Sequence, residues 1–152
     1  MSNSPLTSGS YELDVIIAAK PERVWKAIAT ETSAWWPRDF VTSERTQRFV
    51  IETALGGRAF EDFGGGDGLV WYTVIGVDAG RELVLAGHLL PPFGGPATTA
   101  LRLTLSAQGH GTLLTIRDDR FGALGGDSPI EGWRIVFDNG LRHYLESGEA
   151  TG

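Results

Sequence analysis

SPIEGWRIVFDNGLRHYLESG, residues 128–148, predicts a single long helix near the end of the chain. Ser128 and Glu131 have the spacing of a capping box, and Pro129 suits the first helical position. Gly148 supplies a signal for the end of the helix, since glycine readily adopts the left-handed conformation found there. We therefore expect the rest of the chain to pack against this segment.

One face of this helix is predicted to be buried. At about 100° per residue, five apolar side chains form a single stripe: Ile130, Trp133, Phe137, Leu141 and Tyr144. Two interior glycines, Gly132 and Gly140, each cost the helix about 1 kcal/mol relative to alanine. Gly140 lies at the edge of the stripe, so we expect another backbone or a ligand to approach closely there. The helix is thus predicted to close one side of an apolar cavity.

The segments before this helix predict an α+β domain. YELDVIIAA, which starts at Tyr11, alternates apolar and acidic residues as a half-exposed strand does. PERVWKAIA and TSAWWP then indicate two short helices, and the following runs indicate about six antiparallel strands with turns between them. Residues 1–9 are expected to form a disordered tail and residues 10–148 a single domain. The long helix must then lay its apolar stripe on the concave face of the sheet.

Composition argues against several classes of function. The chain has 152 residues and a formal net charge of -6, whereas nucleic acid and anionic membranes need a basic face. No apolar run approaches the roughly 20 residues that cross a bilayer, so no membrane insertion is expected. No signal peptide is visible, and we therefore expect a cytoplasmic location. The oligomeric state stays open.

No motif predicts a metal site or a cofactor. The chain contains no cysteine, and its three histidines, His88, His110 and His143, lack the spacing of metal ligands. The glycine clusters match neither the dinucleotide-binding nor the phosphate-binding pattern, and no G-x-S-x-G elbow is present. We expect no metal, no cofactor and no nucleophilic catalysis.

Seven motifs, in this order, resemble the START-like (Bet v 1-like) helix-grip superfamily, also called SRPBCC. They are AAKPERVWKAI, WWP, GGRAFED, GLVWYTV, ELVLAG, GTLLTI and EGWRIVFDNGLRHYLESG. Within the superfamily they are similar to the small bacterial homologues of the Hsp90 ATPase activator. The resemblance extends from about Tyr11 to Gly148. It implies a curved seven-stranded antiparallel sheet wrapped around the C-terminal helix, with a cavity between them.

The resemblance implies three candidate functions. Members of the superfamily mostly bind small hydrophobic molecules, so a non-catalytic protein that binds a hydrophobic or aromatic ligand is the leading hypothesis. A minority are cyclases, dehydratases or hydrolases, and a distant branch binds a chaperone. Many relatives carry a histidine after the strand that begins with GT, whereas this chain has IRDDRF at 116–121. That difference weakens the transfer of a detailed site, and fold alone does not choose among the three.

Candidate site residues follow from the aromatic content and the expected strands. The predicted ligand-binding residues are Trp36, Phe40, Phe60, Trp71, His88, Leu103, Trp133, Phe137, Gly140 and Leu141. A carboxylate or imidazole in an apolar pocket has a shifted pKa and can move protons, which makes Glu61 and His88 the candidates for an enzyme. Asp62, Arg117 and Asp118 lie on or next to the same strands. The sequence leaves open which side of 58–63 and 83–90 faces the cavity, because both are partly apolar.

Two further features bear on the alternatives. PPFGGP, residues 91–96, predicts a loop at the rim of the cavity, because proline and glycine together exclude helix and central strand. An interaction with a chaperone would need an exposed apolar patch, for which Phe93 in this loop and Ile135 on the outer face of the helix are the candidates.

Overall fold

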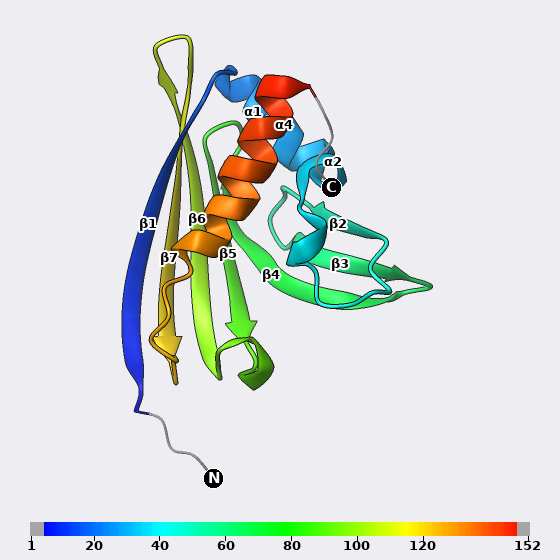
Figure 1. Ribbon diagram of the computed structural model, residues 1–152, viewed down its shortest axis with the longest axis vertical. Helices are drawn as coiled ribbons and strands as arrows, with labels where there is room; N and C mark the ends of the chain where they lie inside the picture. Colours follow the sequence, from blue (N-terminus) through cyan, green and yellow to red (C-terminus); the bar gives the residue numbers. More distant parts are fainter. Residues whose placement is uncertain (1–4, 149–152) are drawn as a thin grey trace.

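The computed structural model describes residues 5–148 and shows a seven-stranded antiparallel sheet that curves around the C-terminal helix (Figure 1). The strands are β1 (Thr7–Ile17), β2 (Arg48–Ile51), β3 (Arg58–Gly64), β4 (Asp67–Asp78), β5 (Glu82–Leu89), β6 (Ala97–Gln108) and β7 (Gly111–Gly122). Their order in the sheet is β1-β7-β6-β5-β4-β3-β2, so β1 and β2 form the two edges. The predicted helix-grip α+β fold is confirmed.

Short helices link the first two strands, as the sequence predicts. They are α1 (Pro21–Thr30), α2 (Thr32–Trp35) and the single turn η1 (Arg38–Phe40); a second turn, η2 (Pro91–Phe93), follows β5. The buried residues of α1 are Val24, Ala27 and Ile28, while Trp25 is partly buried and packs against the core. Trp35 of α2 is fully buried. No helix within residues 5–148 has the length and apolar character needed to cross a membrane.

The first strand begins earlier than the sequence suggests. β1 starts at Thr7, which lies opposite Gly122, and Gly9 lies opposite Arg120. Residues 7–9 were therefore wrongly assigned to a disordered tail. Small polar residues carry no strand pattern of their own, and here the backbone pairing with β7 holds them in place. Residues 1–4 of the expected tail lie outside the described residues.

The C-terminal helix has three sections, α3 (Ile130–Trp133), η3 (Arg134–Arg142) and α4 (His143–Ser147). The helix begins at Ile130, one residue after the predicted first position, and the Ser128 hydroxyl accepts a hydrogen bond from the backbone N–H of Ile130 at 3.2 Å. The section η3 is a π-helix, whose wider turn keeps residues four apart on one face. The buried residues are Trp133, Val136, Phe137, Gly140 and Leu141. Val136 therefore joins the stripe that helical spacing predicts.

Alternation along the central strands builds the core under this helix. Leu101, Leu103 and Leu105 of β6 are buried together, as their spacing predicts. Leu114 and Ile116 of β7 are buried beside them, since Leu103 lies opposite Ile116. Toward the start of β6 and the end of β7, which lie side by side, polar residues replace the apolar ones on this inner face of the sheet. These polar residues form part of the site.

Candidate functional site

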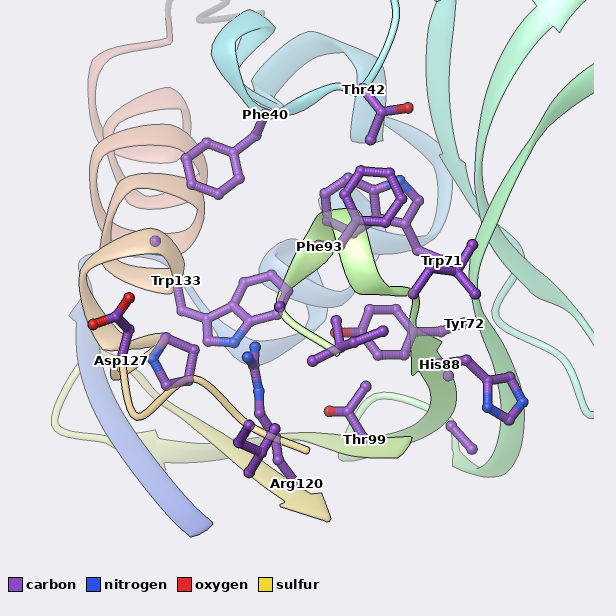
Figure 2. Close-up of a pocket in the computed structure, with 18 of the residues that line it drawn as sticks. Phe40, Thr42, Trp71, Tyr72, His88, Phe93, Thr99, Arg120, Asp127 and Trp133 are labelled. Atoms are coloured by element: carbon purple, nitrogen blue, oxygen red, sulfur yellow. The ribbon is translucent and has the colours of Figure 1, made fainter. Parts of the chain in front are cut away.

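A cavity of about 730 Å³ lies between the sheet and the beginning of the C-terminal helix (Figure 2). Strands β4 to β7, the turn η1, the helix section α3 and the loops after β5 and β7 all contribute to its wall. Its volume falls within the range of about 300–1,000 Å³ that is typical of small-molecule sites. The residues used below are Phe40, Trp71, Tyr72, Thr99, Arg120 and Trp133.

A β-bulge at Trp71 brings two consecutive aromatic side chains to the cavity. Ala59 of β3 lies opposite Tyr72, but the next residue, Phe60, lies opposite Val70, which leaves Trp71 without a partner across the strands. A bulge of this kind re-aims a side chain that regular alternation would place on the other face of the sheet. Both Trp71 and Tyr72 consequently line the cavity.

Glu61 holds one of these aromatic walls in place. Its carboxylate is fully buried and accepts hydrogen bonds from Trp71 Nε1 at 2.7 Å, Thr46 Oγ1 at 2.6 Å and the backbone N–H of Thr42 at 2.8 Å. Glu61 does not itself line the cavity. Its carboxylate thus orients Trp71 and fastens the segment around Thr42 to β3.

Four neighbouring strands carry a cross-strand series that we term the polar row: Tyr72, Gly87, Thr99 and Arg120. Tyr72 lies opposite Gly87, Gly87 opposite Thr99, and Thr99 opposite Arg120. A Cβ added at Gly87 would lie 2.8 Å from the Tyr72 ring and 2.2 Å from the Trp71 carbonyl oxygen. Glycine at this position therefore lets the Tyr72 ring lie across β5 toward Thr99.

Asp118 joins the polar row to the C-terminal helix. Its side chain is buried and accepts hydrogen bonds from Thr99 Oγ1 at 2.7 Å, Arg120 Nη2 at 2.9 Å and Trp133 Nε1 at 2.8 Å. Bonds to an ionised acceptor are shorter and stronger than bonds between neutral groups. One carboxylate thereby fixes Trp133, from the helix, against two side chains of the sheet.

Tyr72 remains protonated at neutral pH. Burial, followed by the negative charge of Asp118, raises the pKa of its phenol well above the ordinary value, against a weaker opposing effect of Arg120. The phenol therefore presents a neutral hydroxyl to the cavity rather than a phenolate.

Four of the predicted ligand-binding residues line the cavity: Phe40, Trp71, His88 and Trp133. The imidazole of His88 is exposed, and Figure 2 shows it turned away from Tyr72 and Arg120. This orientation follows from the register of β5, because Leu85 and Gly87 are buried and His88 falls on the other face. The remaining predicted residues do not line it: Trp36, Phe60, Leu103, Phe137, Gly140 and Leu141.

Two of these aromatic residues lie outside the cavity wall for different reasons. Trp36 stacks on Phe49 with ring centroids 3.7 Å apart and meets Trp71 edge-on at 5.6 Å, so it packs behind that wall. Phe60 lies on the opposite face of β3 from the buried Glu61, and the guanidinium of Arg58 covers its ring at 4.4 Å.

The remaining three, Phe137, Gly140 and Leu141 of the C-terminal helix, are buried in the core, and Phe137 and Gly140 lie against Trp35 of α2. The rings of Trp35 and Phe137 have centroids 6.0 Å apart, and Leu141 is fully buried. A Cβ added at Gly140 would lie 2.7 Å from the Trp35 carbonyl oxygen. Of the two expected alternatives for Gly140, close approach of a ligand or of another backbone, the structure shows the backbone of Trp35.

Leu103 of β6 is buried deeper in the core than the cavity, where it lies between Leu83 and Ile116 of the neighbouring strands.

Among the cavity residues that the sequence did not predict, three provide the polar side chains used below: Tyr72, Thr99 and Arg120. Alternation offered a signal for two of them, because Thr99 continues the buried series of Leu101, and Arg120 continues that of Ile116 and Asp118. Tyr72 had no such signal, since residues 69–72, LVWY, are all apolar or aromatic and show no alternation. Within residues 5–148, no group of three or more histidine, aspartate or glutamate side chains is placed to hold a metal ion.

The family model described as activator of Hsp90 ATPase homolog 1-like protein matches residues 18–146. The chain belongs to this family. The resemblance inferred from the seven motifs is thereby confirmed. A comparison with curated proteins gave no match.

Solved structures show the same fold at low sequence identity. A putative uncharacterized protein from Rhizobium leguminosarum is 16% identical, with a TM-score of 0.69 over 96% of this chain and 99% of that one. The Aha1 dimer from Colwellia psychrerythraea is 17% identical, with a TM-score of 0.60 over 92% and 98%. DynU16, a putative protein in the dynemicin biosynthetic locus, is 22% identical, with a TM-score of 0.64 over 93% of this chain and 49% of that one.

Proposed function

We propose that this protein binds a small hydrophobic or aromatic molecule in the cavity and does not transform it. The observation that carries the proposal is the cavity of about 730 Å³, whose aromatic wall includes Phe40, Trp71, Tyr72 and Trp133. Aromatic side chains contribute large apolar contact areas and preferred ring geometries to such sites. A few polar groups at one end, provided by the polar row, are the usual complement of a ligand pocket.

The positions of the two candidate acid–base residues favour binding over catalysis. Glu61 is engaged by three hydrogen bonds and lies behind Trp71. His88 is exposed, with its ring directed away from the polar row (Figure 2). A general acid or base must come within hydrogen-bond reach of the proton that it transfers, and neither group is placed for that at the polar end of the cavity.

A blocking substitution tests the proposal. Gly125 lines the cavity, and a Cβ added there would meet nothing within 4 Å, so Gly125→Phe adds a ring at the cavity wall without a steric clash. We expect this variant to weaken the binding of 2-methoxynaphthalene, measured by isothermal titration calorimetry, by about tenfold or more, which corresponds to about 1.4 kcal/mol. Leu55→Phe is the control, because Leu55 is 71% exposed and does not line the cavity.

Equal affinities in the two variants would place the probe elsewhere on the protein and contradict the proposal. The natural ligand can be sought in parallel by native mass spectrometry of protein purified from its own host, followed by extraction of any bound molecule. A molecule that co-purifies should raise the melting temperature when it is added back, since a ligand that binds the folded state stabilises it.

A second candidate function is binding to an Hsp90-type chaperone. The family match favours it, together with the exposure of Phe93 (46%) and Ile135 (39%), which are the two apolar residues expected for such a contact. The test is whether the protein stimulates ATP hydrolysis by the Hsp90 of its own host, and whether Phe93→Ser and Ile135→Ser reduce that stimulation. No stimulation by the unaltered protein would remove this candidate.

A further inference from the structure

We infer that the ligand is an uncharged aromatic molecule that carries a hydroxyl group, and that Tyr72 and Arg120 bind this hydroxyl from two sides. The inference rests on the proposed binding function and names the chemical class of ligand that the polar row selects. Three properties of the row support it: the direction of its hydrogen bonds, the free edge of Arg120 and the balance of charge.

The hydrogen bonds of the row have a fixed direction. The Asp118 carboxylate only accepts, so the single hydroxyl hydrogen of Thr99 is donated to its Oδ1, at 2.7 Å. Thr99 therefore has no hydroxyl hydrogen left to donate to the neighbouring Tyr72 oxygen. The Tyr72 oxygen consequently keeps a free lone pair, which makes it a hydrogen-bond acceptor for a group in the cavity.

Arg120 supplies the complementary donor. Its Nε and Nη2 both donate to Asp118 Oδ2, at 3.0 and 2.9 Å, whereas its Nη1 bonds to none of the residues that the structure describes. The guanidinium is 17% exposed and lines the cavity. Figure 2 shows the guanidinium and the Tyr72 hydroxyl directed toward the same space beside Trp133. An acceptor and a donor that face one space match a hydroxyl, which both donates and accepts.

The charges around the cavity favour a neutral ligand. The carboxylate of Asp118 pairs with Arg120 at 2.9 Å and neutralises it. Besides Arg120, the exposed His88 and two tyrosines, the described lining residues include one further ionisable side chain, the carboxylate of Asp127. A ligand carboxylate would therefore meet no net positive field. The pKa of Tyr72, raised by burial and by Asp118, points the same way, because it shows that negative charge on an oxygen is disfavoured here.

The aromatic part of the ligand is indicated by the wall beside the row. The Trp133 ring is fixed by its bond to Asp118, and the Trp71 ring by its bond to Glu61. Phe40 of η1 completes this side of the cavity. Fixed rings of this kind accept another ring in offset or edge-on contact at little entropic cost. A phenol, which joins a flat apolar ring to one neutral hydroxyl, satisfies both the wall and the row.

Three probes with the same ring system separate the possibilities: 2-naphthol, 2-methoxynaphthalene and 2-naphthoate. At neutral pH we expect the naphthol to bind about tenfold more tightly than either of the others by calorimetry, as one hydrogen bond predicts. Tyr72→Phe should bring the naphthol to the affinity of the methoxy compound without changing the latter. Tyr11→Phe is the matched control, since Tyr11 lines the cavity outside the row, and it should preserve the preference.

The outcomes separate this inference from the proposed function. Tightest binding of the naphthoate would identify an anion site at Arg120 and overturn the inference. Equal binding of all three probes to the unaltered protein would also overturn it, while the cavity would remain a ligand site. No binding of any probe would overturn the inference together with the proposed function. Should Tyr72→Phe fail to fold, Arg120→Gln serves as the second variant, because it withdraws the guanidinium donor that faces the cavity.

Discussion

Asp118 is the residue at which the sheet, the helix and the cavity meet. Its carboxylate is 1% exposed and pairs with Arg120 while it also receives the indole N–H of Trp133. A buried ion pair gains little over apolar residues of the same size, but removal of one partner leaves the other charge uncompensated. Replacing one residue of the pair should therefore destabilise the protein more than replacing both.

Replacement of Asp118 alone should be strongly destabilising. We expect Asp118→Leu to lower the free energy of unfolding by about 3 kcal/mol in urea denaturation, because it strands the guanidinium of Arg120. The double variant Asp118→Leu/Arg120→Met should recover a large part of that loss. A double variant as unstable as the single one would attribute the loss to the Thr99 and Trp133 donors instead.

Single residues also show where sequence patterns stop being informative. Alternation with Leu101 and Ile116 is sufficient to place Thr99 and Arg120 on the inner face, although the sequence offers no sign that they meet. The presence of both Trp71 and Tyr72 at the cavity depends on a bulge, which one unpaired residue creates and which leaves no mark in hydrophobic alternation. Phe60 was expected at the cavity because both phases of its strand are partly apolar.

At the scale of elements, the two glycines of the C-terminal helix have different neighbours. A Cβ at Gly140 would lie 2.7 Å from a backbone atom, the carbonyl oxygen of Trp35, and a backbone atom cannot move aside alone. A Cβ at Gly132 would lie 3.3 Å from the end of the Phe40 side chain, which borders the cavity and can shift. The helix therefore needs Gly140 for close packing but does not need Gly132 in the same way.

This contrast predicts opposite effects of the same substitution. Alanine is favoured over glycine inside a helix by about 1 kcal/mol. Gly132→Ala should therefore leave stability unchanged or raise it by up to about 1 kcal/mol. Gly140→Ala should lower the free energy of unfolding by more than about 1 kcal/mol, since α2 must move away from the helix. Thermal and urea denaturation of the two variants measure this difference, and equal effects would contradict it.

Helix boundaries were more predictable than helix geometry. The signals at Ser128 and Gly148 locate both ends of the C-terminal helix within a residue or two. The π-helical section between Arg134 and Arg142 has no such signal, because apolar residues at 133, 137 and 141 suit an α-helix almost as well. The buried residues 133, 136, 137, 140 and 141 have the i, i+3, i+4, i+7, i+8 spacing of an α-helix, so the pattern of burial does not reveal the π-helical section.

At the scale of the whole molecule, ion pairs on the surface link stability to pH. Arg23, followed more weakly by Tyr144, lowers the pKa of Glu31 below its ordinary value of 4.5, despite partial burial. The same direction holds for Glu52, Asp62 and Asp119. A carboxyl whose pKa is lower in the folded state stabilises the fold above its unfolded pKa, and this contribution is lost as the pH falls through the folded value.

The melting temperature should therefore fall as the pH drops below about 4.5. Glu31→Gln should make this fall less steep, whereas Glu22→Gln, on the preceding helix and in no ion pair with a described residue, should not. Calorimetric scans at stepped pH values measure both slopes. Added salt should shrink the difference, because the Glu31 side chain is 21% exposed and its pair with Arg23 is partly screened. Equal slopes in both variants would contradict the assignment.

The order of strands and helices was predictable along the whole chain, but the place of the cavity was not. The seven motifs imply a sheet around a helix, with space between them over the length of the apolar stripe. Trp35 fills that space along the second half of the helix, where Phe137 and Leu141 pack. The cavity is thus confined to the end at which the helix begins, because the bulky residues of α2 occupy the other end.

The pairing of β1 with β7 also has a consequence in time. Leu13 lies opposite Ile116, so the first strand to be synthesised finds its partner only after most of the chain has been made. Closing so long a loop costs entropy before the contact forms, and folds dominated by such distant pairings take roughly milliseconds to seconds to form. Arg120 and Asp118 lie on β7, and Trp133 follows them along the chain. On the ribosome, the binding site is accordingly among the last parts of the protein to form.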